Sequence, residues 1–542
     1  MDAITSVPVP SNEPVRTYAP GTPERASLRT ALGELASERA ELTCTIGGKQ
    51  RMAGGERFDV VQPHDHGHVL GTSAQATRDD VGDAVTAAKD AAASWAATPF
   101  DERAAVLLRA ADLLSGPWRD TINAATMLGQ SKSVQQAEIE AACEFADFLR
   151  FNVHFARRLL AEQPISVPGE WNRMEYRPLD GFVTAITPFN FTAISANLPT
   201  APALMGNTVV WKPTPTQQLA AHHTMRMLEA AGLPPGVINL VTGDGRAVSE
   251  VALTDPGFGG LHFTGSAATF KKLWKTIGEN LDAYGCYPRI VGETGGKDFI
   301  VAHPSADPAP LVTAMVHGAF EYQGQKCSAA SRAYVPRSLW ESGLREQLAD
   351  TARTVSYGDV SDFSHFGGAV IDRRAFAKHQ AALARAADEP SLEVLAGGGC
   401  DDSVGYFVEP TVLVGTDPED EAFTSEYFGP ILAVHVYDDA QYDEVLDVVE
   451  RTSPYALTGA VFATERDAVE RAHRKLRYAA GNFYVNDKPT GSIVARQPFG
   501  GSRASGTNDK AGSLFNVQRW TSPRAIKETF DAPTHHTYPH MG

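Results

Sequence analysis

Two short motifs in the middle of the chain hold residue types that could carry out covalent chemistry on a carbonyl group. Residues 321–332 read Glu-Tyr-Gln-Gly-Gln-Lys-Cys-Ser-Ala-Ala-Ser-Arg, which places one cysteine, Cys327, among small neighbours. Upstream, residues 292–297 read Gly-Glu-Thr-Gly-Gly-Lys and supply the carboxylate of Glu293. A thiol nucleophile and a carboxylate base are the minimum equipment for covalent catalysis on a carbonyl. We therefore expect Cys327 to be the nucleophile and Glu293 the general base.

The surroundings of Cys327 favour it over the other cysteines. A free thiol has a pKa of about 8.5 and is mostly protonated at neutral pH, so a nucleophilic cysteine needs activation. Gly324 and the small residues 328–331 leave room for a substrate, and we expect helix N-terminal amides there to favour the thiolate. A structural cysteine usually has bulky apolar neighbours. Cys286 is the competitor, but no base motif accompanies it.

A third candidate lies at the end of a short apolar run. Residues 187–191 read Thr-Pro-Phe-Asn-Phe. The side-chain amide of Asn190 could donate to an oxyanion that develops on the substrate. An asparagine beside a proline is just as often a simple turn former, so both interpretations stay open on the sequence alone.

The elements that must position these residues follow a strand–helix rhythm. Short runs rich in β-branched residues predict strands at 181–186, 208–211, 237–241 and 260–263. Helical stretches lie between them, the clearest at 217–231. Such alternation is typical of βαβ units and a buried parallel sheet. A nucleotide usually binds at the carboxyl ends of those strands.

The turn after the run at 260–263 is the best candidate for a phosphate site. A glycine and a serine at an expected N-cap precede a helix that runs to about 278, and its free N–H groups suit a pyrophosphate. An ordinary capped helix has the same pattern. The candidate ligands in this turn are Gly265, Ser266, Ala267, Ala268 and Thr269. The Gly-Asp-Gly of 243–245 lacks the third glycine of a dinucleotide fingerprint and predicts only a tight turn.

Three further residues are candidates for cofactor contacts. Lys212 follows a predicted strand and could bond ribose hydroxyls, although a lysine there is usually just solvated. Glu426 and Phe428 lie just before another predicted strand. Glu426 could bind sugar hydroxyls and Phe428 could pack near a nicotinamide, whereas a simple turn is the alternative. No metal site is predicted, and the three histidines of the last residues (535, 536 and 540) form only a weak candidate.

Composition excludes several classes of protein. A chain of 542 residues is too long for one compact core and long enough for two or three domains. A net charge of −17 argues against a nucleic-acid partner. No apolar run approaches the ~18 residues of a membrane span, and the first ten residues predict no secretory signal. Five scattered cysteines without Cys-x-x-Cys spacing argue against zinc and disulfides, so we expect a reducing, cytoplasmic location.

The rest of the chain yields coarser predictions. Helices are expected at 27–41, within 77–114 and at 442–451. Two more helices are expected after residue 114 and up to residue 158. A second alternating region spans 299–494 and includes predicted strands at 408–414 and 431–436. Turn residues within 165–180 predict a β-ribbon.

Taken in order, these motifs resemble the aldehyde dehydrogenase superfamily over roughly residues 40–525. The finer pattern is similar to the members that act on L-glutamate γ-semialdehyde, the open form of Δ1-pyrroline-5-carboxylate. The supporting strings lie at 187–194, 263–271, 324–329, 490–494, 497–508 and 520–523. Phe270, where the superfamily commonly has glycine, suits this subfamily. Pro215 stands where many relatives carry an acid that selects NAD over NADP, and the predicted cofactor is NAD.

The resemblance implies an α/β fold with a Rossmann-like cofactor domain, an α/β catalytic domain and a β-hairpin for oligomerisation. We place the NAD-binding domain at 1–164 and 181–292 and the catalytic domain at 293–500. The oligomerisation hairpin and C-terminal arm would be 165–180 and 501–542. The implied partners are further copies of the chain and a proline dehydrogenase.

The implied reaction begins with attack of the Cys327 thiolate on the aldehyde. Asn190 and the Cys327 N–H would stabilise the oxyanion, and Glu293 would activate the water that hydrolyses the thioester to glutamate. The substrate-binding candidates are Thr187, Phe191, Ser328, Gly491, Ser492 and Phe499. Two alternatives stay open: an enzyme for another semialdehyde such as succinic semialdehyde, with the 487–499 loop as discriminator, and a non-catalytic NAD-binding relative.

Overall fold

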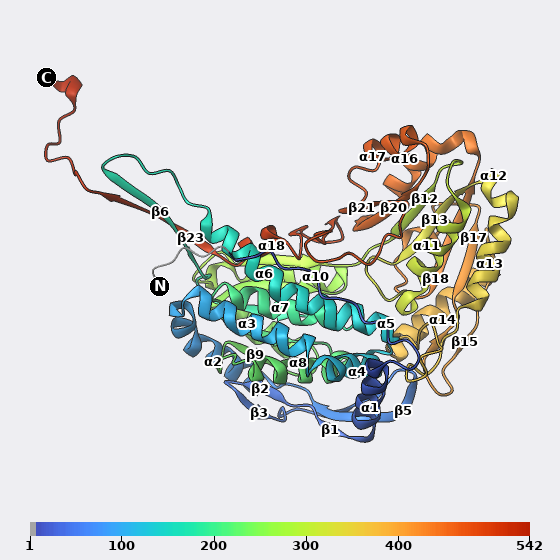
Figure 1. Cartoon of the computed structure of the whole chain (residues 1–542), viewed down its shortest axis with the longest axis horizontal. Helices are drawn as coiled ribbons and strands as arrows, with labels where there is room; N and C mark the ends of the chain where they lie inside the picture. Colours follow the sequence, from blue (N-terminus) through green and yellow to red (C-terminus); the bar gives the residue numbers. More distant parts are fainter. Residues whose placement is uncertain (1–6) are drawn as a thin grey trace.

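The computed structural model describes residues 7–542 and folds them into two lobes with a projecting arm (Figure 1). Each lobe is built on a seven-stranded sheet that helices cover. The predicted α/β class is confirmed. The first six residues of the predicted N-terminal arm lie outside the described residues. Within 7–542, no helix is both long and apolar enough to cross a membrane.

The sheet of the first lobe has the order β11-β10-β7-β8-β9-β2-β3. Its strands are β2 (Cys44–Ile46), β3 (Lys49–Arg51), β7 (Phe182–Ile186), β8 (Val209–Lys212), β9 (Ile238–Leu240), β10 (Phe258–Thr264) and β11 (Arg289–Glu293). Strands β7 to β11 run parallel, while β2 pairs antiparallel with both neighbours. Their carboxyl ends therefore share one edge. Lys212, Thr264 and Glu293 end their strands there, which gathers several predicted site residues.

Helices cover both faces of this sheet (Figure 1). They are α1 (Pro23–Ser37), α2 (Arg78–Ala97), α3 (Phe100–Ser115), α4 (Arg119–Gln130), α5 (Val134–Ala137), η1 (Glu138–Cys143), α6 (Glu144–Ala161), α7 (Thr192–Leu204), α8 (Gln218–Ala230), α9 (Arg246–Val251) and α10 (Ala267–Glu279), with single turns η2 (Pro215–Gln217), η3 (Ala252–Thr254) and η4 (Leu281–Ala283). Segments α5, η1 and α6 form one continuous helix whose middle turn is π-helical. Such turns are frequent near functional sites.

Local chemistry explains where the structure differs from the predicted bounds. The first helix begins at Pro23 rather than residue 27 because Thr22 caps it by accepting from the N–H of Arg25. The predicted strand 408–414 is two strands, β16 (Phe407–Val408) and β17 (Thr411–Gly415), because Pro410 cannot donate to a sheet ladder. Sequence reasoning also missed the small sheet of β1 (Ala40–Glu41), β4 (Arg57–Gln62) and β5 (Asp65–Ala74).

The second lobe has a sheet of order β14-β17-β18-β13-β12-β20-β21, parallel except for the edge strand β14. Its further strands are β12 (Asp298–Ala302), β13 (Ala330–Pro336), β14 (Leu392–Ala396), β18 (Ile431–Tyr437), β20 (Thr458–Phe462) and β21 (Asn482–Val485). Its helices are α11 (Pro308–Phe320), η5 (Glu321–Gly324), α12 (Arg337–Leu339), η6 (Trp340–Leu344), α13 (Arg345–Thr354), α14 (Arg373–Asp388), α15 (Glu421–Thr424), η7 (Asp439–Gln441), α16 (Tyr442–Thr452) and α17 (Arg466–Lys475).

A two-stranded ribbon projects from the first lobe (Figure 1). Strand β6 (Glu170–Arg177) pairs antiparallel with β23 (Ser522–Thr529), with Arg177 opposite Ser522. The remaining short elements are β15 (Cys400–Asp401), β19 (Tyr455–Ala456), β22 (Ser502–Arg503), α18 (Leu514–Arg519) and η8 (Pro539–Met541). The ribbon pairs the predicted 165–180 segment with the C-terminal part of the chain. The outer face of the ribbon is exposed.

Candidate active site

Cys327 lies in a turn between η5 and strand β13. The three residues Tyr322, Gln323 and Gly324 have φ angles of 49°, 54° and 65°. This left-handed region is unfavourable for residues other than glycine, so the turn is strained. At Gly324 a Cβ atom would lie 2.2 Å from the carbonyl oxygen of Gly429, so only glycine fits there.

Buried amide side chains hold this turn in place. Gln323 donates from Nε2 to the carbonyl oxygens of Ser131 at 3.0 Å and Ala369 at 2.7 Å. The side-chain oxygen of Gln325 accepts from the N–H of Ile371 at 2.9 Å. Buried hydrogen bonds of this kind are costly to break, so they offset the backbone strain before Cys327.

The surroundings of Cys327 favour the protonated thiol. Burial raises its pKa well above the usual value, and the carboxylates of Asp298, Glu293 and Glu426 raise it further. The expectation that helix N-terminal amides favour the thiolate is wrong, because the residues after Cys327 form a turn and then strand β13. Activation of the thiol therefore requires removal of its proton when a substrate is bound.

Asn190 lies beside this turn. Its side chain is buried, and Nδ2 donates to the carbonyl oxygen of Gln325 at 3.0 Å. Asn190 and Cys327 line the same cavity. An NH2 group has two hydrogens, so one remains for an oxyanion. The arrangement suits the predicted role of Asn190 at the end of strand β7.

Glu293 is turned away from this cavity. It ends strand β11, and its carboxylate lies against the backbone of Gly500 and Gly501. Burial raises its pKa well above the usual value, although Lys510 lowers it. Glu293 contributes to neither of the two cavities described below. Its charge acts on the thiol of Cys327, but a base role requires its side chain to rotate toward the substrate.

The larger cavity, about 990 Å³, opens at the carboxyl edge of the first sheet. Lys212 and Thr214 line it after strand β8, and both are well placed for ribose hydroxyls. Burial lowers the pKa of Lys212 to about 8, while Asp244, which also lines the cavity, raises it. The hydroxyl of Thr214 is buried and has no hydrogen-bond partner within residues 7–542. An unpaired polar atom in a cavity wall fits a hydroxylated ligand.

Helix α10 begins at the wall of this cavity. Ser266 is its N-cap, as predicted, and accepts from the N–H of Thr269 at 3.2 Å. Gly265, Ser266 and Thr269 line the cavity, while Ala267 and Ala268 form the first helical turn. The positive end of a thirteen-residue helix is thereby available to a phosphate group.

The opposite wall comes from the segment before strand β18. The Oε1 atom of Glu426 accepts from the N–H of Gly296 at 2.8 Å, and burial raises the pKa of Glu426. Phe428 has a φ of 57°, and its ring meets that of Phe189 edge-on at 5.8 Å. Glu426 and Phe428 line the cavity near Cys327. The residues present therefore fit a dinucleotide.

A second cavity, about 440 Å³, lies on the other side of Cys327. Cys327 and Ile194 line both cavities, so the thiol lies where they meet. Five of the six predicted substrate residues line the second cavity: Phe191, Ser328, Gly491, Ser492 and Phe499. The hydroxyl groups of Ser328 and Thr490 are 2.8 Å apart.

Thr187 is not brought together with the other predicted substrate residues. It lines the larger cavity, and its hydroxyl is 2.7 Å from that of Ser195 and accepts from Trp211 Nε1 at 3.1 Å. These partners leave it little capacity for a substrate. Its side chain instead helps hold strands β7 and β8 to helix α7.

Sequence reasoning missed charged residues in the second cavity. Glu140 pairs with Lys132 and with Lys326, the latter at 2.6 Å. Glu144 lines the cavity without a hydrogen bond or ion pair inside the 7–542 range. Burial raises its pKa to about 8, and Glu140 adds to the shift, whereas Lys132 and Lys326 oppose it. The sequence did hold one signal: Glu140 and Glu144 are four residues apart, which places their side chains next to each other on a helix.

The N-terminal segment also reaches this cavity. Asn12, Glu13, Pro14 and Val15 form part of its wall. No residue type or spacing in this extended segment predicts such a position, because the contacts are made with helices more than a hundred residues away in the sequence.

Comparison with known proteins identifies the family of the chain. The model of the aldehyde dehydrogenase family matches residues 51–526. The chain belongs to the aldehyde dehydrogenase family. The predicted superfamily resemblance is thus confirmed, and with it the fold.

This aldehyde dehydrogenase has close relatives that carry more specific names. It is 47% identical to the mitochondrial Δ1-pyrroline-5-carboxylate dehydrogenase of Dictyostelium discoideum, over 99% of this chain and 97% of that one. The Homo sapiens protein of the same name is 48% identical over 96% and 92% of the two chains. A crystal structure of the Δ-pyrroline-5-carboxylate dehydrogenase from Mycobacterium tuberculosis bound with NAD is 63% identical, covers 100% of both chains and has a TM-score of 0.97.

The predicted cytoplasmic location is contradicted by these relatives. The Dictyostelium discoideum, Bos taurus and Homo sapiens proteins are all named as mitochondrial. The prediction relied on five free cysteines, which indicate a reducing environment. Free cysteines cannot distinguish one reducing compartment from another, so they were insufficient evidence for the cytoplasm.

Proposed function

We propose that this aldehyde dehydrogenase oxidises L-glutamate γ-semialdehyde to L-glutamate with NAD, the second step of proline breakdown. The observation that carries the proposal is the position of Cys327 between a dinucleotide-sized cavity and a smaller one with charged walls. The names of the relatives support the same substrate.

The larger cavity is assigned to NAD. Lys212 and Glu426 would bond ribose hydroxyls, the first turn of α10 would face the pyrophosphate, and Phe428 would pack near the nicotinamide. Bound NAD would supply the ring that accepts a hydride. The protein's own contribution is to hold the reacting carbon beside Cys327 and to exclude water from it.

The reaction begins when the sulfur of Cys327 bonds to the aldehyde carbon and its proton is transferred to a base. Nδ2 of Asn190 and the N–H of Cys327 then stabilise the oxygen anion. Loss of a hydride from that carbon restores its C=O bond and converts the adduct into a thioester of Cys327. Glu293 takes a proton from a water molecule, whose oxygen attacks the thioester carbon. The C–S bond breaks, glutamate is released and Cys327 recovers its proton.

The smaller cavity suits the amino acid end of the substrate. The N–H groups of Gly491 and Ser492 make no hydrogen bond within the chain from residue 7 onward, and Ser328 adds a hydroxyl. These donors suit the α-carboxylate. Glu144 offers an unpaired carboxyl group, and a bound α-ammonium group would lower its raised pKa and so charge it. Phe191 and Phe499 would enclose the methylene chain.

The alternatives are less well supported. Succinic semialdehyde has a carboxylate but no ammonium group, so it would leave Glu144 without a partner. A non-catalytic role would not explain why the strained turn places Cys327 beside Asn190 at the junction of two cavities. The geometry therefore favours an enzyme for an amino acid semialdehyde.

The choice of NAD over NADP is assigned to Asp244. Pro215 stands where an acid is common in relatives, but Asp244 lines the same end of the cavity and acts electrostatically on Lys212. A carboxylate there would repel a 2′-phosphate. The acid that selects NAD would thus be Asp244, in the turn after β9, instead of a residue at position 215, in the turn after β8.

We keep the predicted division into an NAD-binding part (1–164 and 181–292), a catalytic part (293–500) and an oligomerisation part (165–180 and 501–542). The ribbon supports assembly with further copies, because Ile165, Trp171 and Phe530 are exposed on it or beside it. A proline dehydrogenase is the proposed supplier of substrate. The proline utilization A protein of Bdellovibrio bacteriovorus supports this link: it is 30% identical, and 98% of this chain matches 55% of that one with a TM-score of 0.91.

The test is the rise of NADH absorbance with a series of aldehydes. Glutamate semialdehyde should give the highest kcat/KM, succinic and glutaric semialdehydes should be intermediate, and butanal should be lowest. Equal kcat/KM values for butanal and glutamate semialdehyde would reduce the proposal to a general aldehyde dehydrogenase.

A further inference from the structure

The N-terminal segment Asn12–Tyr18 lies across helices of the first lobe and forms one wall of the smaller cavity. We call it the strap. We propose that residues 12–15 of the strap are part of the substrate site and that Asn12 is a positioning residue, which fixes the 491–496 loop for binding of the substrate carboxylate. This inference rests on the proposed function of that loop.

Asn12 joins the strap to both sides of the cavity. Its Nδ2 donates to Oδ2 of Asp147 at 2.8 Å and to the carbonyl oxygen of Val494 at 3.0 Å. Its Oδ1 accepts from Nε of Arg496 at 2.9 Å. Both hydrogens and the oxygen of the amide are therefore used, and two of the three bonds are made with the loop that follows Gly491 and Ser492.

The other bond ends on the helix that carries Glu144. Asp147 lies three residues after Glu144 on helix α6, and both residues line the smaller cavity. The N–H of Glu13 donates to Oδ1 of the same Asp147 at 2.7 Å. Asn12 thus fixes the distance between the proposed carboxylate-binding loop and the proposed ammonium ligand.

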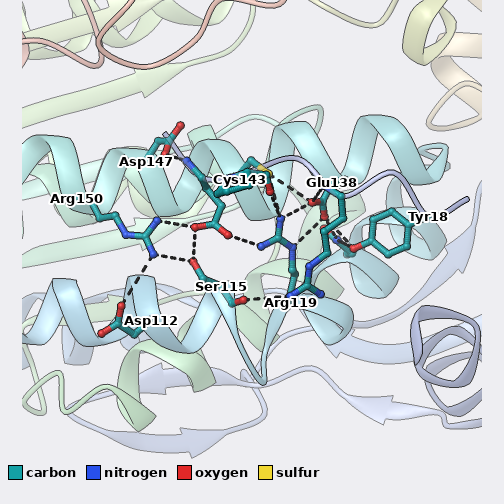
Figure 2. Close-up of polar contacts among 12 residues, drawn as sticks. Tyr18, Asp112, Ser115, Arg119, Glu138, Cys143, Asp147 and Arg150 are labelled. Atoms are coloured by element: carbon teal, nitrogen blue, oxygen red, sulfur yellow. Dashed lines mark hydrogen bonds and ion pairs between the residues drawn. The ribbon is translucent and has the colours of Figure 1, made fainter. Parts of the chain in front are cut away.

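A buried ionic cluster holds the strap itself (Figure 2). The carboxylate of Glu13 accepts from Arg119 at 2.6 Å, from Arg150 at 2.6 Å and from Ser115 at 3.0 Å. Burial alone raises the pKa of Glu13, but these hydrogen bonds outweigh it and hold the pKa below the usual value. Glu13 is therefore charged at neutral pH and firmly paired.

The far end of the strap is bound in the same cluster. Glu138, on the π-helical turn, pairs with Arg119 and accepts from the N–H of Arg16 at 2.8 Å and the hydroxyl of Tyr18 at 2.9 Å (Figure 2). Tyr18 is buried and has a φ of 50°, a conformation that this cluster has to maintain. The strap is consequently rigid enough to position the loop.

Apart from Asn12, the loop is attached to the first lobe by Val494, whose side chain is buried in the hydrophobic core of that lobe. Ile493 donates to the side chain of Gln497 at 3.0 Å, and the N–H groups of Arg496 and Gln497 both donate to the carbonyl oxygen of Ile493. These bonds lie within the loop and do not attach it to the rest of the protein. Asn12 adds a hydrogen-bonded attachment to the apolar packing of Val494, so its loss should loosen the carboxylate site without moving Cys327.

The experiment compares Asn12→Ala with the unmodified full-length enzyme. KM for glutamate semialdehyde should rise about tenfold, the cost of one or two hydrogen bonds, while its kcat and the KM for butanal stay close to the original values. Arg16→Ala is the matched control, because the side chain of Arg16 makes one hydrogen bond within residues 7–542, to the carbonyl oxygen of Ser115 at 3.5 Å, and does not line the cavity. It should leave both KM values unchanged.

Measurements on the unmodified enzyme distinguish a failure of the proposed function from a failure of the proposed role of Asn12. If it does not prefer glutamate semialdehyde over butanal, the proposed function is wrong, whatever the variants do. If it has that preference and Asn12→Ala keeps the same KM, the strap has no positioning role. A parallel rise in KM for both aldehydes, or a fall in kcat for both, would equally overturn the inference. Thermal unfolding of each variant shows whether the fold is retained, and Asn12→Ser supplies a milder second variant.

Discussion

The side-chain nitrogen of Asn190 lies 3.0 Å from the carbonyl oxygen of Gln325, two residues before Cys327. Asn190 follows a strand of the first sheet, whereas Cys327 precedes a strand of the second. One hydrogen bond therefore joins the two lobes at the reaction centre. It fixes the proposed oxyanion donor relative to the proposed nucleophile before any substrate binds.

Substitution of Asn190 by alanine should lower kcat by about 10²–10³, the usual effect of removing one oxyanion donor. KM should change much less, because the amide contributes mainly to the transition state. Steady-state NADH formation measures both. An unchanged kcat would show that Asn190 only forms the turn.

Cys327→Ala should abolish aldehyde oxidation and leave NAD binding intact, since Cys327 lies at the junction of the two cavities. Cys286→Ala is the matched control, because Cys286 contributes to neither cavity. NAD binding can be followed by quenching of tryptophan fluorescence. Activity retained by Cys327→Ala and lost by Cys286→Ala would mean that the nucleophile is misassigned.

Glu293→Gln should accumulate the thioester, with a burst of NADH followed by slow turnover. The pKa of Glu293 is raised by burial, so its basic form appears only above the ordinary carboxyl range. Thioester hydrolysis should therefore rise with pH through that raised pKa, and the variant should lose this rise. Rapid-mixing measurements across pH give both results. A variant with the original steady-state rate would remove Glu293 from the mechanism.

The enzyme should prefer NAD to NADP in kcat/KM, with Asp244 as a cause. Asp244→Ala should narrow the preference by about tenfold, because a charge that repels the 2′-phosphate is lost. Kinetics with both cofactors at fixed ionic strength test this. A preference for NADP in the unmodified enzyme would overturn the assignment of Lys212 and Glu426 to ribose hydroxyls.

Ser492→Pro removes one of the N–H groups proposed to bind the substrate carboxylate. A charge-assisted hydrogen bond contributes about 1.5–3 kcal/mol, so KM for glutamate semialdehyde should rise roughly ten- to hundredfold. Glu144→Gln should raise the same KM and leave succinic semialdehyde nearly unaffected, because that substrate has no ammonium group. Equal effects on butanal would show that neither residue recognises the amino acid end.

Local signals in the sequence were sufficient to propose the chemistry and to predict much of the secondary structure. Cys327 among small residues, the motif around Glu293 and the serine cap of helix α10 depend on neighbours within a few positions. Residue type and spacing therefore identified them. The same holds for the predicted strands at 181–186, 208–211, 237–241, 260–263 and 431–436, whose bounds differ from the observed ones by one or two residues. The prediction for 408–414 was wrong, because that segment forms two strands.

Tertiary structure alone decided which residues line the two cavities. Thr187 carries a suitable hydroxyl, but Ser195 and Trp211 occupy it. Glu144 and Asn12 reach the smaller cavity because a π-helical turn and a buried ion cluster bring distant segments together. Such contacts depend on desolvation and on partners more than a hundred residues apart, which no local pattern in the chain records.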